Sequence, residues 1–130
     1  MTRHPVTVSL DETLGRVRDL FQRHQFHHLL VVADGRLVGV VSDRDLLKAL
    51  SPNLGSLSEN SRDLATLNKR VHQIMSRHLR VLPEDATVED AIKLFNSERI
   101  SCIPVVDHNH AAVGILSWRD IMRALPAMVL

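Results

Sequence analysis

Residues 39–45 read Gly-Val-Val-Ser-Asp-Arg-Asp, and residues 114–120 read Gly-Ile-Leu-Ser-Trp-Arg-Asp. Each stretch predicts an apolar strand that turns directly into a helix, because amphipathic residues follow the last aspartate. A strand that leads into a helix directs unpaired backbone N–H groups and the positive end of the helix dipole toward one place, which suits a phosphate group. The aspartate, one turn into the helix, can accept hydrogen bonds from both hydroxyls of a ribose. Two such stretches predict two related binding sites.

The chain around these two stretches is also repeated. Residues 1–4, Met-Thr-Arg-His, return as Met-Ser-Arg-His at residues 75–78, which lie 74 positions further along. Gly39 and Gly114 lie 75 positions apart, so the second half has gained one residue ahead of its glycine. An internal duplication with one loop insertion is the simplest explanation of these offsets.

Each repeat is predicted to contain a short strand, a helix, two further strands and a second helix. The first helix of each repeat has apolar residues at helical spacing: Leu14, Val17, Leu20 and Phe21 in the first repeat, and Val88, Ala91, Ile92 and Phe95 in the second. Asp34-Gly35 between apolar runs predicts a tight hairpin, Thr87 with Asp90 predicts a capping box, and Pro126 is expected to end the last helix. Between the repeats, one helix is predicted from the spacing of Leu64, Leu67, Val71 and Ile74.

The composition is that of an ordinary globular protein. Hydrophobic residues make up 45% and charged residues 24% of the 130 residues, which is a common balance. Lys and Arg number 16 and Asp and Glu 15, a formal net charge of +1, so a nucleic-acid surface is not expected. No apolar run is long enough for a membrane helix, and the single cysteine, Cys102, fits a reducing compartment. The sequence therefore predicts a cytoplasmic protein that binds neither nucleic acid nor a membrane.

The pattern of glycine, two apolar residues, serine, any residue, arginine and aspartate, present twice, resembles that of the cystathionine-β-synthase (CBS) domain. CBS domains occur in tandem as a Bateman module, and the resemblance covers nearly the whole chain. It implies an α/β (α+β) fold of two β-α-β-β-α repeats packed about a pseudo-twofold axis, with two clefts between them. Residues 1–60 would form the first repeat with the inter-repeat loop, and residues 61–130 the lead-in helix and the second repeat. Two such modules often join as a homodimer.

The resemblance also implies a function, which is regulation through an adenosine-containing ligand such as AMP, ADP or ATP. In this family the aspartate holds the ribose, and the serine and arginine lie near the ribose or the phosphate. The pair His27-His28 resembles a His-Arg pair that reaches phosphate in some nucleotide-sensing CBS subunits. The implied nucleotide-binding residues are Gly39, Ser42, Arg44, Asp45, His27, His28, Gly114, Ser117, Arg119 and Asp120. The expected partners are an adenosine compound, a second copy of the chain and an unidentified regulated protein.

Other interpretations of the same residues remain open. Ser-x-x-Asp before an apolar run is also a helix-capping pattern, and glycine in a strand can serve close packing instead of a ligand. Arginine in a first helical turn can be an ordinary surface residue, and histidine at a strand entry can be partly buried packing. No catalytic motif or metal-ligand spacing is present, so neither an enzyme nor a required cofactor is expected. The alternative function is a constitutive protein-interaction or dimerisation module with degenerate pockets.

Overall fold

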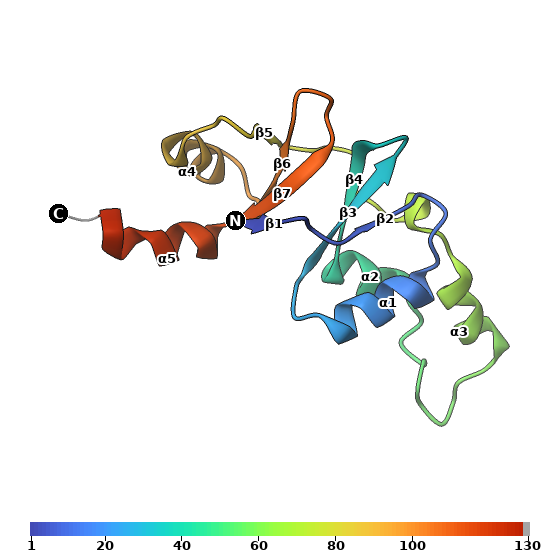
Figure 1. The fold of residues 1–130 in the computed structure, drawn as a ribbon. Coiled ribbons are helices and arrows are strands. Elements are labelled where there is room, and N and C mark those ends of the chain that lie inside the picture. Colours follow the sequence, from blue (N-terminus) through green and yellow to red (C-terminus); the bar gives the residue numbers. More distant parts are fainter. Residues whose placement is uncertain (129–130) are drawn as a thin grey trace. The chain divides into compact units, whose positions relative to one another are not determined.

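The computed structural model of the chain describes residues 1–128 (Figure 1). These residues form two compact units, and each unit carries one copy of the duplicated motif. The N-terminal unit consists of Val6–Asp34 and Val38–Leu79, and the C-terminal unit consists of Met1–Pro5, Gly35–Leu37 and the chain from Arg80 onward.

The N-terminal unit is built on a three-stranded sheet with the strand order β2-β3-β4. Its strands are β2 (Thr7–Val8), β3 (His28–Ala33) and β4 (Arg36–Ser42), and β2 pairs with β3 in parallel. α1 (Leu14–Arg23) connects the two parallel strands, and α2 (Asp43–Ala49) follows β4 directly. This is the predicted order of strand, helix, two strands and helix.

Local sequence explains where these elements begin and turn. Thr13 caps α1, because its Oγ1 accepts a hydrogen bond from the backbone N–H of Arg16 at 3.2 Å, a common use of threonine at a helix start. Asp34 and Gly35 have φ values of 52° and 76°. A two-residue hairpin requires such left-handed values, and Asp-Gly adopts them readily. The predicted first helix and hairpin are confirmed.

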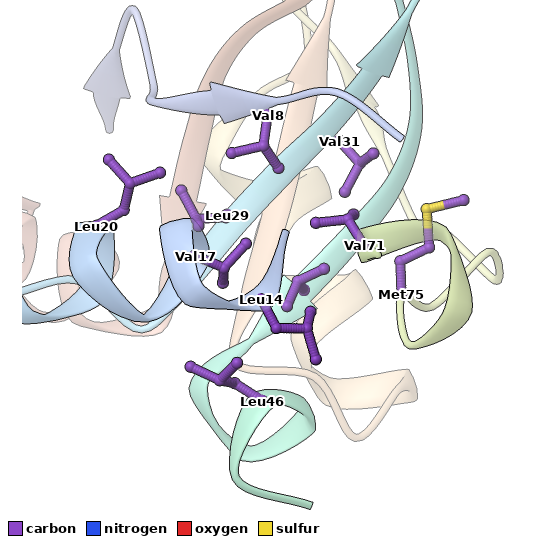
Figure 2. Packing of buried hydrophobic residues seen from close by; sticks show 10 residues of the cluster. Val8, Leu14, Val17, Leu20, Leu29, Val31, Leu46, Val71 and Met75 are labelled. Carbon is purple, nitrogen blue, oxygen red and sulfur yellow. The ribbon is translucent and has the colours of Figure 1, made fainter. Parts of the chain in front are cut away.

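A cluster of ten buried residues forms the core of the N-terminal unit (Figure 2). Leu14 and Val17 of α1 pack with Leu29 of β3, and all three side chains are 0% exposed. Burying one such side chain stabilises the fold by roughly 1.5–3 kcal/mol. The apolar stripe predicted for this helix is therefore its buried face. The other members of the cluster are Val8, Leu20, Val31, Val41, Leu46, Val71 and Met75.

The prediction of one continuous helix between the repeats is wrong. The chain instead forms α3 (Ser61–Ala65) and two short 3₁₀ turns, η1 (Thr66–Asn68) and η2 (Val71–Gln73). Between the two turns the backbone is extended, and it bonds to the start of α1: the N–H of Leu14 donates to the carbonyl of Lys69 at 2.9 Å. The apolar spacing reflects the burial of Val71 in the core and not one helical face.

The C-terminal unit contains a four-stranded sheet with the strand order β1-β7-β6-β5. Its strands are β1 (Thr2–Arg3), β5 (Leu82–Pro83), β6 (Cys102–Val106) and β7 (Ala112–Ser117). β6 pairs antiparallel with β7 and parallel with β5. Its helices are α4 (Val88–Ser97) and α5 (Trp118–Met128).

The two helices of the C-terminal unit test two sequence predictions. Thr87 and Asp90 form the predicted capping box of α4: the N–H of Asp90 donates to Thr87 Oγ1 at 3.1 Å, and the N–H of Thr87 donates to Asp90 Oδ2 at 2.9 Å. The prediction that Pro126 ends the last helix is wrong, because α5 continues to Met128. The described helix includes two residues after this proline, although proline removes one backbone hydrogen bond and its ring crowds the carbonyl oxygen four residues earlier.

The leading segment of each repeat belongs to the unit that contains the other motif copy. In the C-terminal unit, β1 pairs with β7, and Thr2 lies opposite Ile115. In the N-terminal unit, Ser76 lies opposite Val40, with hydrogen bonds of 2.9 and 3.1 Å between their backbones. The same register in both units is what a duplication predicts. The mixed α/β fold is confirmed, whereas the division at residues 60 and 61 stays a prediction.

Candidate functional site

The first copy of the motif forms the junction between β4 and α2. Ser42 is the N-cap of α2, and its Oγ accepts a hydrogen bond from the backbone N–H of Asp45 at 3.1 Å. In return, Asp45 Oδ2 accepts a hydrogen bond from the backbone N–H of Ser42 at 3.0 Å. This reciprocal pair is a capping box, so the capping interpretation of the two residues is confirmed.

The second copy repeats this geometry between β7 and α5. Asp120 Oδ2 accepts hydrogen bonds from the backbone N–H of Ser117 at 2.8 Å and from its hydroxyl at 3.2 Å. The backbone N–H of Asp120 donates to Ser117 Oγ at 3.3 Å. The duplication therefore extends to the hydrogen bonds that hold each aspartate.

Capping leaves each aspartate able to bind a ligand as well. The capping bonds use Oδ2 of Asp45 and of Asp120, while an ionised carboxylate offers about four acceptor positions on its two oxygens. Both residues are partly exposed. Because each carboxylate is already ordered by its bond to the backbone, a ligand hydroxyl would meet a preorganised acceptor.

His27 and Asp43 join the entry of β3 to the start of α2 through two hydrogen bonds. His27 Nδ1 lies 2.9 Å from Asp43 Oδ2, and the backbone N–H of Asp43 donates to the carbonyl oxygen of His27 at 3.0 Å. These bonds place the histidine pair of the first repeat beside its Ser-Asp junction. The structure thus brings together two predicted groups that are 16 residues apart in the sequence.

His28 differs from His27 because it is partly buried. Burial is the main cause that lowers the pKa of His28 from its ordinary value of 6.5, the charge of Asp43 raises it, and His27 lowers it further. A histidine whose pKa is lower in the folded chain than in the unfolded chain makes the unfolded chain bind more protons as the pH falls. The stability that depends on a neutral His28 is complete above about pH 6.5 and is lost as the pH falls below it.

We therefore expect the melting temperature of the wild type to decrease between pH 7 and pH 5, and His28→Gln to flatten this decrease. Thermal unfolding at pH 7, 6 and 5 measures both. The lowered pKa values of Asp63, Asp90 and Asp107 act at lower pH, near the ordinary carboxyl value of 3.8. An unchanged pH dependence in the His28→Gln variant would show that this ring is not the group that titrates.

The second motif copy has different chemistry around the same junction. The backbone N–H of Trp118 donates to the carbonyl oxygen of Ser101 at 3.3 Å, at the place that the histidine–aspartate pair occupies in the first repeat. The Arg119 guanidinium lies 5.6 Å from the centre of the Trp118 ring, within cation–π range. Burial raises the pKa of the Cys102 thiol to about 12, so this thiol is not a nucleophile at neutral pH.

Close packing explains why Gly39 and Gly114 are glycine. A Cβ atom on Gly39 would lie 2.5 Å from Met75 Sδ, and one on Gly114 would lie 2.8 Å from Met1 Sδ. The same Cβ atoms would lie only 3.1 Å from a backbone carbonyl oxygen, that of Ser76 at Gly39 and that of Thr2 at Gly114. These distances support the packing interpretation of the two glycines, and their contact with a ligand stays a prediction.

Sequence reasoning missed two kinds of contact at the junctions. One is made by Asp43 and Trp118, and the other by the leading segments of the two repeats. Asp43 and Trp118 occupy the variable position of the motif, where the pattern requires no particular residue. The leading segments, which begin at Met1 and Met75, pack against the glycines, and the repeated Met-Ser/Thr-Arg-His stretch was the signal that could have indicated this role.

The side chains of Arg44 and Arg119 are exposed, so both are accessible to an anion.

Two further kinds of feature are absent from residues 1–128. Within that range, no group of three or more His, Cys, Asp or Glu side chains could hold a metal ion. No helix of the described part of the chain is long and apolar enough to cross a membrane.

Comparison with known sequences agrees with this geometry. The CBS domain family matches residues 1–52 and 71–127. A homoserine O-acetyltransferase of Methanosarcina acetivorans is 30% identical to this chain over 122 residues, which cover 93% of the chain and 20% of that protein. The chain thus spans only about a fifth of the length of this relative.

Two solved structures share the fold at similar length. The CBS domain pair of protein MJ0100, solved in complex with 5′-methylthioadenosine and S-adenosyl-L-methionine, has a TM-score of 0.78 and 26% sequence identity, over 99% of this chain and 94% of that one. CBSX2, solved in complex with AMP, has a TM-score of 0.79 and 27% identity, over 98% of this chain and 93% of that one.

The family match covers most of the chain in two segments. Each segment contains one complete copy of the Ser-Asp junction, and the strand ahead of each junction has the same register against the leading segment of the other repeat. The chain therefore belongs to the CBS domain family and contains two copies of the domain in tandem.

Proposed function

We propose that this chain is a regulatory module that senses an adenosine-containing ligand, such as AMP, ADP, ATP or a related compound. The observation that carries the proposal is the duplicated Ser-Asp junction, in which each aspartate is ordered by the backbone yet keeps acceptor capacity. Support comes from the MJ0100 domain pair and CBSX2, which share the fold and were solved with adenosine compounds.

The aspartates are the residues that we assign to the ribose. A ribose has two neighbouring hydroxyls that need acceptors, and one carboxylate in each site, Asp45 or Asp120, would supply them. Ser42 and Ser117, whose hydroxyls are bonded at the same junctions, would lie beside the sugar.

The exposed arginines and the histidine pair are the residues that we assign to phosphate. Arg44 and Arg119 each lie two positions after the capping serine, and a guanidinium offers phosphate a rigid fork of donors. His27 and His28 add a second set of ring nitrogens in the N-terminal unit only, and a ring nitrogen donates to phosphate only when it carries a proton. The two sites are therefore expected to differ in their affinity for charged ligands.

A thermal-shift screen tests the proposal. A site filled to 100 times its dissociation constant adds about 2.7 kcal/mol of stability, which raises the melting temperature of a chain of this size by several degrees. AMP, ADP, ATP, NAD, S-adenosylmethionine and 5′-methylthioadenosine at millimolar concentration are the test compounds, and GMP and CMP are the controls. If none of the adenosine compounds raises the melting temperature, the ligand-sensing function is wrong.

The alternative is a constitutive interaction or homodimerisation module, and exposed apolar residues support it. Leu47 on α2 is 72% exposed, and its counterpart Met122 on α5 is 54% exposed. Val129 and Leu130 are also apolar, and they lie outside the described residues. Light scattering at tens of micromolar tests this function. A monomer that fails to bind any adenosine compound would contradict both ligand sensing and homodimerisation.

A further inference from the structure

The hydrogen-bonded pair of His27 and Asp43 distinguishes the two motif copies. The Nδ1 atom of the ring lies 2.9 Å from the carboxylate oxygen, and the side chains are 60% and 41% exposed. Their counterparts in the second copy are Ser101 and Trp118, neither of which carries a charge. The first copy therefore has a group whose charge depends on pH directly beside its Ser-Asp junction, and the second copy does not.

The bond to Asp43 determines which proton the neutral ring of His27 carries. A carboxylate only accepts hydrogen bonds, so the neutral ring must keep its proton on Nδ1. The other nitrogen, Nε2, then has a lone pair and cannot donate to an anion. When the ring gains a second proton, Nε2 becomes a donor, and the net charge of the pair changes from −1 to zero.

We propose that the His27–Asp43 pair makes the first site select its ligand by charge in a pH-dependent way. With a neutral ring, the negative charge of Asp43 and the lone pair of Nε2 disfavour an anionic group and permit an uncharged or cationic adenosine compound. With a protonated ring, the pair is neutral and offers a donor, so the site accepts an anionic group. This inference rests on the proposed function and adds the class of ligand that the first site prefers at each pH.

Other charged groups lie on the elements that adjoin the pair. They are His28 on β3, Asp45 and Arg44 on α2, His24 after α1, and Arg77 on the leading segment. Burial lowers the pKa of His28. The Arg77 guanidinium donates to the carbonyl oxygen of His72 at 3.4 Å. Among these groups, His27 has a hydrogen bond to the Asp43 carboxylate, which fixes Nε2 as the nitrogen that gains the second proton.

The test uses a ligand whose own charge is constant. AMP is unsuitable, because a phosphate monoester changes charge near pH 6. Adenosine 5′-sulfate keeps a single negative charge between pH 6 and pH 8, and adenosine is the uncharged control. The affinity of each site is followed separately through the backbone amide NMR signals of Gly39 in the first motif copy and Gly114 in the second. The two sites are called the Gly39 site and the Gly114 site below.

The wild type should bind adenosine 5′-sulfate at the Gly39 site about fivefold more tightly at pH 6 than at pH 8, as expected for one charge near a solvent-exposed anion. Adenosine should bind at the Gly39 site with the same affinity at pH 6 and at pH 8. His27→Gln should abolish the pH dependence, and Asp43→Asn should raise the affinity at pH 8 about fivefold. The Gly114 site is the internal control, and its affinity should be the same at both pH values.

The possible results separate this inference from the function on which it rests. Equal affinities at pH 6 and pH 8 at the Gly39 site would overturn the inference and leave nucleotide sensing intact. No binding of any adenosine compound at either pH would overturn both. The nitrogen NMR spectrum of the free protein at pH 8 gives an independent test, because a His27 ring with its proton on Nε2 would also overturn the inference.

Discussion

Asp120→Asn is expected to weaken the binding of an adenosine compound to the C-terminal unit by one to two tenfold steps. Asparagine keeps the size of the side chain and one oxygen that can cap α5, but its amide nitrogen cannot accept a ribose hydroxyl. A hydrogen bond to a charged group contributes roughly 1.5–3 kcal/mol, which corresponds to this change in affinity. The free energy of unfolding should change by less than about 1 kcal/mol, because the capping bond from the backbone of Ser117 can persist.

A titration followed by the fluorescence of Trp118 measures this loss of affinity directly. It is the only tryptophan of the chain, it lies between Ser117 and Asp120, and it is 48% exposed. Its fluorescence should therefore respond to a ligand at the second junction. Asp45→Asn is the matched control, because it changes the equivalent aspartate of the other unit and should leave the Trp118 titration curve unaltered. Equal affinities of Asp120→Asn and the wild type would remove the ribose role from Asp120 and leave only its capping role.

The parts of the fold that could be predicted are those in which local chemistry and the repeat agree. The Asp34-Gly35 turn, the Thr87–Asp90 capping box and the stripe that begins at Leu14 each need only neighbouring residues. The two Ser-Asp junctions were predictable because they occur twice. Their capping bonds are observed, and their ligand contacts stay predictions.

The parts that could not be predicted depend on residues far apart in the sequence. The segment around Val71 has helical spacing, but its backbone bonds to the start of α1 keep it from forming one helix. Nothing local to Asp43 shows that its carboxylate meets His27, 16 positions earlier. The pairing of Thr2 with Ile115 joins positions near the two ends of the chain, and no periodic pattern in one segment contains that information.

Gly39→Ala is expected to destabilise the chain by about 1–3 kcal/mol, the usual cost of overpacking a filled core. The added methyl carbon would start 2.5 Å from Met75 Sδ and 3.1 Å from the carbonyl oxygen of Ser76. Met75 is only 8% exposed, so its side chain has little room to move. Replacing glycine also lowers the entropy of the unfolded chain, which offsets about 0.4–1 kcal/mol of this cost. Urea unfolding of the variant and the wild type gives the difference.

Gly114→Ala is the matched control, and it is expected to cost less than Gly39→Ala. The corresponding contact is with Met1 Sδ at 2.8 Å, but Met1 is 46% exposed and its side chain can rotate into solvent. Equal losses in the two variants would show that the backbone approach at 3.1 Å, and not the buried methionine, determines the cost.

Ligand affinity separates the two interpretations of Gly39, close packing and room for a ligand. A Gly39→Ala protein that loses stability but binds the ligand normally supports packing, whereas normal stability with lost affinity at the first site would show that Gly39 makes room for the ligand.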